Sequence, residues 1–463
     1  MRLPSASPRL LRAWAALVVG LAATSIASTA MAHGRPPRVG ELHLDPGDPD
    51  RIVARSTWGL VQSDDGGETW RWVCAVAIGF DPTLEDPAFA ITEGSTLLFG
   101  TFTGLTRSSD DRCTWEVPAP VVDRRYVIDL ETEAGSPADL LAVVTSGISD
   151  DLLLRSDDGG VRYEEMQRFD DVLLERVTIA PSDVGRVYLS GARLSEDRTD
   201  REGVLLRSED GGRTFEEATI ELDDGERNVF VLAVDPTDPG RLWARVVRRI
   251  TDTRDERLLL SEDGGRSFRT VAGARELSGV AVASDGSVVW AASGNGGGLL
   301  RSVDGGRSFE TIHADLDVLC LEARGTSELW LCVNELIDGY AIGRSLDAGD
   351  TLEPMFVFAD TGALPACPAC TPVDVICPQW IPDLVADLDL DAGIELPDAA
   401  TGLPRDIGVP ERCSHLFDAG PDTTPPATGC GCRAAGRGPA APPALASVAL
   451  LGLVLARRRR RGR

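Results

Sequence analysis

The chain has 463 residues, with 73 Asp and Glu against 46 basic residues, so its formal net charge is −27. All the basic residues are arginine, which excludes reactions that need a lysine nucleophile or Schiff base. The four histidines are isolated in the sequence, without metal-binding or catalytic-triad spacing. Because so acidic a chain repels phosphates, we exclude nucleic acid as a partner. Calcium or a cationic surface fits this charge better.

Residues 1–32 have the order of a secretory signal peptide. Three arginines precede an apolar run at 13–23, and Ala30-Met31-Ala32 offers a small-residue cleavage site. We therefore expect an exported chain. An uncleaved membrane helix is the alternative, which the short apolar run disfavours.

An eight-residue phrase, Ser-x-Asp-x-Gly-x-Thr/Ser-aromatic, recurs seven times at intervals of 41 to 53 residues. A fixed period of this size predicts a repeat architecture. In one repeat, residues 229–272, four short apolar stretches alternate with turn signals, and the phrase separates the third from the fourth. Each repeat therefore predicts one four-stranded antiparallel sheet. The copies begin at Ser63, Ser108, Ser156, Ser208, Ser261, Ser302 and Ser345.

The chemistry of the phrase predicts a tight hairpin. Its glycines supply positive φ angles, and its Ser and Asp side chains can bond the backbone amides of the turn. The final aromatic residue is expected to pack between neighbouring sheets. Arg112, Arg162 with Tyr163, and Leu352 depart from the phrase, so looser turns are expected in those copies.

The phrase resembles the Asp-box, or BNR repeat, of sialidases, sortilin-type receptors and other propellers. The resemblance implies an all-β chain whose residues 38–358 form a seven-bladed β-propeller of four-stranded antiparallel blades. It also implies that the boxes are structural and lie opposite the usual ligand face. The clearest box residues are Ser63, Asp65, Gly67, Trp70, Ser208, Asp210, Gly212, Phe215, Ser261, Asp263, Gly265, Phe268, Ser302, Asp304, Gly306 and Phe309. On this reading the chain closes the ring without exchanging a strand.

Ten cysteines in an exported chain predict disulfides. Cys320 and Cys332 lie in two apolar stretches joined by a short turn, so a hairpin would bring them together. Cys74 and Cys113 are expected to pair between neighbouring blades. Two further disulfides, rather than a zinc site, are expected among the cysteines beyond the repeats, Cys367, Cys370, Cys377 and Cys413.

Residues 359–417 are rich in Pro, Asp and Cys, and predict a small disulfide-stapled segment before an extended linker at 418–429. One acidic stretch within it resembles a calcium loop, in which alternate carboxylates converge on one ion. An acidic solvated stalk is the alternative, because alanine replaces the turn glycine of such a loop. No other cofactor is expected. The calcium candidates are Asp387, Asp389, Asp391, Glu395 and Asp398.

In residues 430–463, Cys430 and Cys432 precede an apolar run at 444–456 and a terminal arginine cluster. The run is shorter than the roughly 20 residues that span a bilayer. This order resembles the MYXO-CTERM sorting tail of myxobacteria. The resemblance implies cleavage and lipidation near these cysteines, with display at the cell surface through a processed membrane anchor. An uncut anchor is the alternative.

Two long loops between the second and third strands of neighbouring repeats, 191–203 and 248–257, are candidates for ligand contact, because recognition often resides on long loops. Solvated hairpin extensions are the alternative. The candidate residues are Arg193, Glu196, Arg198, Arg201, Arg248, Arg249 and Arg254.

These patterns favour a monomeric, non-catalytic binding module that recognises a glycan or an envelope protein. A carbohydrate-active hydrolase on the same scaffold is the alternative, and it requires clustered carboxylates around the central channel. A sialidase would also need a tyrosine nucleophile, for which Tyr340, near Glu335, is the one plausible position.

Overall fold

A computed structural model describes residues 35–102, 104–117, 125–146, 150–194, 201–218, 220–249, 251–361, 364–387 and Cys413. These residues belong to a compact unit spanning 1–414, and a second unit spans 415–463. The expected signal peptide, linker and sorting tail, with Cys430 and Cys432, lie outside the described residues. Among the described helices, none has the length and apolar character needed to cross a membrane.

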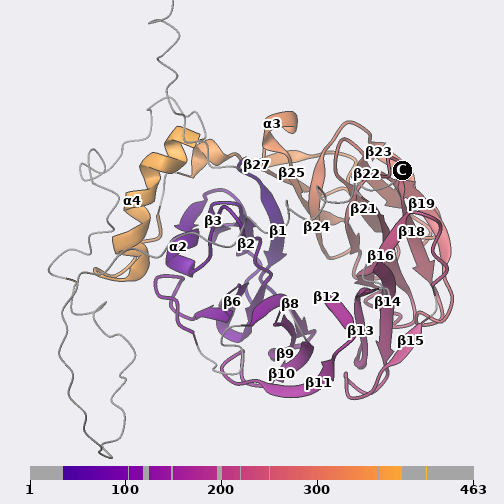
Figure 1. Ribbon diagram of the computed structural model, residues 1–463. Coiled ribbons are helices and arrows are strands. Elements are labelled where there is room, and N and C mark those ends of the chain that lie inside the picture. Colours follow the sequence, from indigo (N-terminus) through magenta and orange to yellow (C-terminus); the bar gives the residue numbers. More distant parts are fainter. Residues whose placement is uncertain are drawn as a thin grey trace, which may run out of the picture. The chain divides into compact units, whose positions relative to one another are not determined.

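The described unit is a seven-bladed β-propeller (Figure 1). Blade 1 contains β1 (Val39–Leu44), β2 (Ile52–Ser56), β3 (Gly59–Ser63) and β4 (Arg71–Cys74). Blade 2 contains β5 (Phe89–Thr92), β6 (Thr96–Thr101) and β7 (Gly104–Ser108). Blade 3 contains β8 (Tyr126–Glu133), β9 (Ser136–Thr145), β10 (Asp151–Ser156) and β11 (Glu164–Phe169). Blade 4 contains β12 (Val172–Ala180), β13 (Asp183–Leu194), β14 (Arg201–Ser208) and β15 (Glu216–Ala218).

The remaining blades repeat this order. Blade 5 contains β16 (Glu226–Val234), β17 (Leu242–Arg248), β18 (Glu256–Ser261) and β19 (Arg269–Ala274). Blade 6 contains β20 (Leu277–Val282), β21 (Val289–Ser293), β22 (Gly298–Ser302) and β23 (Glu310–His313). Blade 7 contains β24 (Val318–Arg324), β25 (Glu328–Val333), β26 (Ile342–Ser345) and β27 (Glu353–Phe356). Each sheet is antiparallel and built from consecutive strands, so the first and last blades exchange no strand.

Blade 2 departs from the four-stranded pattern. Among its described residues, one antiparallel bridge between Arg107 and Glu116 stands where the other blades have a fourth strand.

The repeated phrase forms the turn after the third strand of each blade. In the first copy, the Ser63 hydroxyl donates to Asp65 Oδ1 at 2.7 Å and accepts from the Gly67 amide at 2.8 Å. Asp65 also accepts from the Thr69 amide at 2.8 Å. In the second copy Arg112 takes the glycine position with φ 69°, and Asp110 still accepts from the Thr114 amide at 2.9 Å. The missing glycine therefore leaves the carboxylate cap in place.

The second glycine of the phrase leaves room for a large side chain of the preceding blade. Gly67 has φ 93°, and a Cβ there would lie 2.9 Å from the ring of Trp330. Trp330 is fully buried in β25, so this contact joins blade 7 to blade 1. Trp243 and Trp290 make the corresponding contacts with the turns of blades 6 and 7. Blades 7 and 1 are therefore joined by the same contact between a buried tryptophan and a glycine turn that joins neighbouring blades within the ring.

Other contacts across the closure seam are also side-chain contacts. The Trp70 indole Nε1 donates to the Met355 carbonyl at 2.9 Å, and its ring lies 5.2 Å from that of Phe356. The aromatic residue that ends the first copy of the phrase thus packs against the last strand of blade 7. This matches the predicted role of the aromatic position.

The described helices connect or follow the strands. They are α2 (Ala75–Ile78), α3 (Glu335–Asp338), α4 (Pro372–Asp387) and the 3-10 helices Glu93–Ser95 and Phe358–Asp360. Only α4 is long, and it packs on α2 and β4 at the outside of blade 1 (Figure 1). The segment after blade 7 therefore crosses the seam and covers the outer edge of blade 1.

Disulfides fix this segment to the propeller. Cys377 in α4 bonds Cys74 at the end of β4, and Cys367 bonds Cys113 in the turn of blade 2. The expected Cys74–Cys113 pair was wrong, because α4 lies against β4 and brings Cys377 to Cys74. Only one bond, Cys370–Cys413, joins two cysteines beyond the repeats. Cys320 and Cys332 lie opposite each other in β24 and β25 and are bonded, as the hairpin predicted.

Candidate functional site: the central cavity

A cavity of about 700 Å³ runs along the axis of the ring. The first strands of all seven blades line it, namely β1, β5, β8, β12, β16, β20 and β24. The lining reaches from Gly40 at the start of β1 to Pro46 beyond its end, so the cavity follows the strands over their length. Its volume is in the range of pockets that hold small ligands or side chains of a partner.

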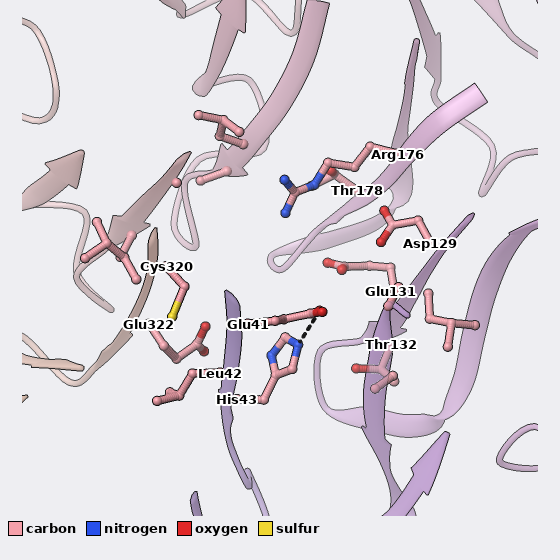
Figure 2. A pocket seen from close by; sticks show the side chains of 18 of the residues that line it. Glu41, Leu42, His43, Asp129, Glu131, Thr132, Arg176, Thr178, Cys320 and Glu322 are labelled. Atoms are coloured by element: carbon pink, nitrogen blue, oxygen red, sulfur yellow. Dashed lines mark hydrogen bonds and ion pairs between the residues drawn. The ribbon is translucent and has the colours of Figure 1, made fainter. Parts of the chain in front are cut away.

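The wall of the cavity is chemically two-sided. Blades 5 and 6 contribute mainly apolar residues from β16 and β20, together with Arg245 from β17. Most of the ionisable side chains come from β1, β8, β12 and β24 (Figure 2). The apolar wall contains Phe230, Leu232, Val280 and Val282. The ionisable wall contains Glu41, His43, Asp129, Glu131, Arg176 and Glu322.

Strand periodicity explains how short segments supply these pairs. Side chains two residues apart on a strand share a face, so Glu41 and His43 of β1 point the same way, as do Asp129 and Glu131 of β8. The intervening Leu42 and Leu130 are buried between blades. Each inner strand therefore packs mainly with one set of side chains and lines the cavity with the other. Thr132, which lies beside a register shift at the end of β8, also lines the cavity.

Glu41 and His43 form a charged pair. His43 Nε2 lies 3.2 Å from Glu41 Oε1, and the Arg55 guanidinium of β2 approaches Glu41 Oε2 at 3.4 Å. Burial opposes both charges, but their mutual hydrogen bond and charge outweigh it. The pKa of His43 is raised to about 9, and the pKa of Glu41 lies below its ordinary value. Both groups are therefore charged at neutral pH.

Glu131 and Glu322 lack such partners. Neither carboxyl makes a hydrogen bond to another described residue, and both face the cavity (Figure 2). Burial, followed by the negative charge of Asp129, raises the pKa of Glu131 to about 8. Burial likewise raises the pKa of Glu322. Glu131 thus holds its proton at neutral pH.

Asp129 has only backbone partners. Its Oδ2 accepts from the Val177 amide at 2.9 Å, and burial raises its pKa to about 6 against the opposing charge of Arg176. The Arg176 guanidinium makes no hydrogen bond to another described residue, although its charge acts on both Asp129 and Glu131. The cavity therefore combines unpaired carboxyls with an uncommitted guanidinium.

The expected ligand loops lie elsewhere. Arg193 binds Glu217 at 3.0 Å and Arg254 binds Asp252 at 2.6 Å, while Arg248 pairs with Glu226 at 3.0 Å. Arg201 pairs with Glu175 at 3.2 Å, and the Arg249 amide donates to the Gly225 carbonyl at 2.9 Å. None of these arginines lines the cavity. Glu196 and Arg198 lie outside the described residues.

Tyr340 is unsuited to nucleophilic attack. It is 9% exposed, it does not line the cavity, and burial raises its pKa to about 12. This disfavours the sialidase form of the hydrolase hypothesis.

The remaining predicted sites do not converge with the cavity. The Ser-x-Asp turns lie beside the turns between first and second strands, as where the Gly66 amide donates to the Asp50 carbonyl at 2.8 Å. Of the calcium candidates, Asp387 ends α4 and the other four lie outside the described residues. Within the described part of the chain, no group of three or more His, Cys, Asp or Glu side chains could hold a metal ion.

The sequence reading missed the cavity residues. Their signal was an acidic residue inside an apolar first strand, as in VIDLETE around Glu131 and VLCLEAR around Glu322. Such a residue reads equally well as the solvated face of a strand. Convergence becomes visible only when the ring brings β8 and β24 to one axis.

Comparison with solved structures finds other propellers. An ancestral GH74 enzyme is 15% identical with a TM-score of 0.51, and the match covers 69% of this chain and 44% of that enzyme. A puromycin-hydrolyzing peptidase of Mycobacterium tuberculosis is 14% identical with a TM-score of 0.50, covering 71% of this chain and 54% of the peptidase. YCF48 from Cyanidioschyzon merolae is 14% identical with a TM-score of 0.46, covering 69% and 98%.

The two matches with a TM-score of at least 0.50 agree with the β-propeller fold and show nothing finer. The chain spans less than two thirds of the GH74 enzyme and of the peptidase. No protein-family model matches the chain, and no curated protein matches its sequence.

Proposed function

We propose that this protein is an exported, cell-surface-anchored, non-catalytic binding module whose glycan or envelope-protein ligand is held in the central cavity. The observation that carries the proposal is the cavity wall, where Glu131, Glu322 and Arg176 are directed inward without hydrogen-bond partners among the described residues. Buried polar groups are normally paired, so groups left open around a cavity favour a ligand that completes them. Export and anchoring rest on the two terminal segments of the sequence.

The pairing of the loop arginines favours the cavity, and not the loops, as the main binding surface. Arg193, Arg248 and Arg254 each form an ion pair with an acidic side chain of the same blade. A ligand that bound them would first have to compete with these partners. Ligand groups entering the cavity meet no such competition at Glu131 or Glu322.

A plug in the cavity tests this function. Thr132 lines the cavity, and Thr132→Trp would occupy part of its volume. Val303, which is 72% exposed in the turn of blade 6, gives the matched control Val303→Trp. Both variants and the wild type are applied to a glycan array and to envelope extracts. We expect interactions of the wild type to be retained by Val303→Trp and lost by Thr132→Trp. Interactions that survive the plug would contradict the proposal.

A hydrolase remains a second candidate because of one observation. The pKa of Glu131 is raised to about 8 while that of Glu41 lies below its ordinary value, so a protonated and an ionised carboxyl line the same cavity. Glycoside hydrolysis uses such a pair as general acid and as nucleophile or base. Release of reducing sugar from a polysaccharide panel, abolished by Glu131→Gln, would favour this candidate. No release by the wild type would remove it.

A further inference from the structure

We propose that the central cavity binds an organic cation, an ammonium or guanidinium group on an aliphatic chain, between Glu131, Asp129 and Glu322. This inference rests on the proposed function and names the ligand chemistry of the same site. It concerns a small set of side chains from β8, β12 and β24.

The carboxyls supply the charge that such a ligand needs. Glu131 and Asp129 project from β8, and Glu322 projects from β24 toward the same space (Figure 2). The electrostatic effects of Asp129 and Glu322 on Glu131 indicate that the three groups act on one another. Two cations act on Glu131: Arg176, which makes no hydrogen bond to a described residue, and His43, which is bonded to Glu41. Glu131, Asp129 and Glu322 therefore make no ion pair with any described arginine or histidine.

A second observation points independently to a ligand. Thr178 of β12 lines the cavity and is only 8% exposed. Its hydroxyl has no hydrogen-bond partner within the described part of the chain. An N–H donor of a bound ammonium or guanidinium would pair it.

The opposite wall fits the aliphatic part of the ligand. Leu232 and Val280 are 7% and 8% exposed, and they line the cavity with Phe230. One face of the Phe230 ring is covered by Arg245, whose Cζ lies 4.8 Å from the ring centre. That cover disfavours sugar stacking on Phe230. Because no metal-binding group occurs among the described residues, an organic cation fits better than a metal ion.

The carboxyls of the cavity bind protons more tightly than exposed carboxyls do. The groups that face Glu131 are His43 and Glu41 on β1, Asp129 on β8, Arg176 on β12 and Glu322 on β24. Burial raises the pKa of Glu131 to about 8 and that of Asp129 to about 6. A bound cation favours the ionised carboxyls, so binding releases protons. Affinity should therefore rise with pH between about 6 and about 8.

Calorimetric titration of the full chain tests the inference. The probes are 1,5-diaminopentane and n-butylguanidine, with 1-pentanol as the neutral comparison. We expect the cations to bind at least tenfold more tightly at pH 8.5 than at pH 6, and 1-pentanol to bind at least tenfold more weakly than the cations. Equal binding of 1-pentanol, or affinity for the cations that falls as pH rises, would overturn the inference.

Paired variants locate the binding. Glu131→Gln/Glu322→Gln removes two cavity charges, and Glu68→Gln/Glu164→Gln removes two exposed ones without a described side-chain partner. We expect at least a tenfold loss of affinity in the first pair only. Thr178→Val, nearly isosteric, should weaken binding several-fold and serves if the double variant fails to fold. Equal losses in the cavity and control pairs would refute the site.

The source of the cation is distinguished by a second set of probes. Short peptides with one central Arg or Lys are titrated beside the free amines, and peptides with Gln at that position are the controls. Tighter binding of the Arg or Lys peptides supports a protein ligand, and tighter binding of the free amines supports a small-molecule ligand. If Thr132→Trp removes partner binding while no cation binds, this inference fails and the proposed function stands. If the cations bind but Thr132→Trp still captures the partner, the inference stands and the proposed function fails.

Discussion

At the scale of single residues, folding keeps Glu131 in its protonated form at neutral pH. Its carboxyl is enclosed by the ring and keeps its proton to about pH 8, while an unfolded chain releases it near its ordinary value of 4.5. The folded state therefore binds more protons than the unfolded state between these pH values, and the protein loses stability as pH rises through them. His43, with its pKa raised to about 9 from 6.5, acts in the same direction.

Replacing Glu131 by an uncharged residue should remove its share of this loss. We expect Glu131→Gln to raise the free energy of unfolding by about 1–2 kcal/mol at pH 8.5 and to leave it nearly unchanged at pH 4. Urea denaturation at the two pH values measures the difference, and Glu68→Gln is the exposed control. A gain of the same size at both pH values would show that charge at Glu131 is not the cause.

The aspartates of the turns show the opposite titration. Burial works against the charge of Asp263, but hydrogen bonds from Ser267 and its neighbours hold the pKa at about 2. The stability that these bonds provide is present above the ordinary pKa of 3.8 and is lost as pH falls toward 2. The ionised carboxylate of Asp263 therefore stabilises the turn at neutral pH.

Removing one turn carboxylate should destabilise the protein modestly. Asp263 accepts from the Ser267 amide at 2.9 Å and from the Ser267 hydroxyl at 2.6 Å. We expect Asp263→Ala to lower the free energy of unfolding by about 1–2 kcal/mol at pH 7. Asp315→Ala, at an exposed position without a described partner, is the control. Equal effects of the two substitutions in thermal denaturation would argue against the role of the turn bonds.

At the scale of elements, α4 acts as a clasp on the ring. It follows the last blade, packs on β4 of the first, and is bonded to it through Cys377 and Cys74. This bond joins residues 303 positions apart, so it constrains nearly the whole propeller in the unfolded state. The Cys320–Cys332 bond joins residues 12 positions apart within one hairpin. The chain-entropy model gives the larger loop the greater stabilisation.

The two bonds can be compared directly. We expect Cys74→Ser/Cys377→Ser to lower the free energy of unfolding by about 4–5 kcal/mol, and Cys320→Ser/Cys332→Ser by about 3 kcal/mol. Limited proteolysis should in addition cut the first variant near α4. A first variant as stable and as protease-resistant as the second would show that the clasp does not hold the ring.

At the scale of the whole molecule, the sequence predicts features that form within one turn or strand. It does not predict which distant residues the fold brings together. Residues such as Asp65 and Gly67 act within one turn, so the phrase indicated the turns, the strand order and the number of blades. The partner of Cys74 is 303 residues away and depends on where α4 packs. The gathering of Glu131 and Glu322 depends on the ring, because each alone resembles an exposed strand residue. The calcium candidates, Asp387 included, stay untested predictions.

The carboxyl groups at the axis differ from those at the surface in how their charge is compensated. The chain carries a net charge of −27, and exposed carboxylates are compensated by solvent and by arginine pairs. In the cavity, neither solvent nor arginine pairs compensate the carboxyl groups completely, so Glu131 keeps its proton at neutral pH. A ligand that brings its own positive charge is therefore favoured at the axis over the surface.

Site-specific photo-crosslinking tests the central claim most directly. A photoreactive residue is placed in the full chain at Thr132 in the cavity, at Thr253 in the loop 248–257, or at Val303 in the turn of blade 6. Each variant is expressed at the cell surface, irradiated, and examined for covalent adducts. We predict adducts from Thr132 that are absent from the other two positions. Adducts from Thr253 with none from Thr132 would place binding on the loops and contradict a cavity-centred module.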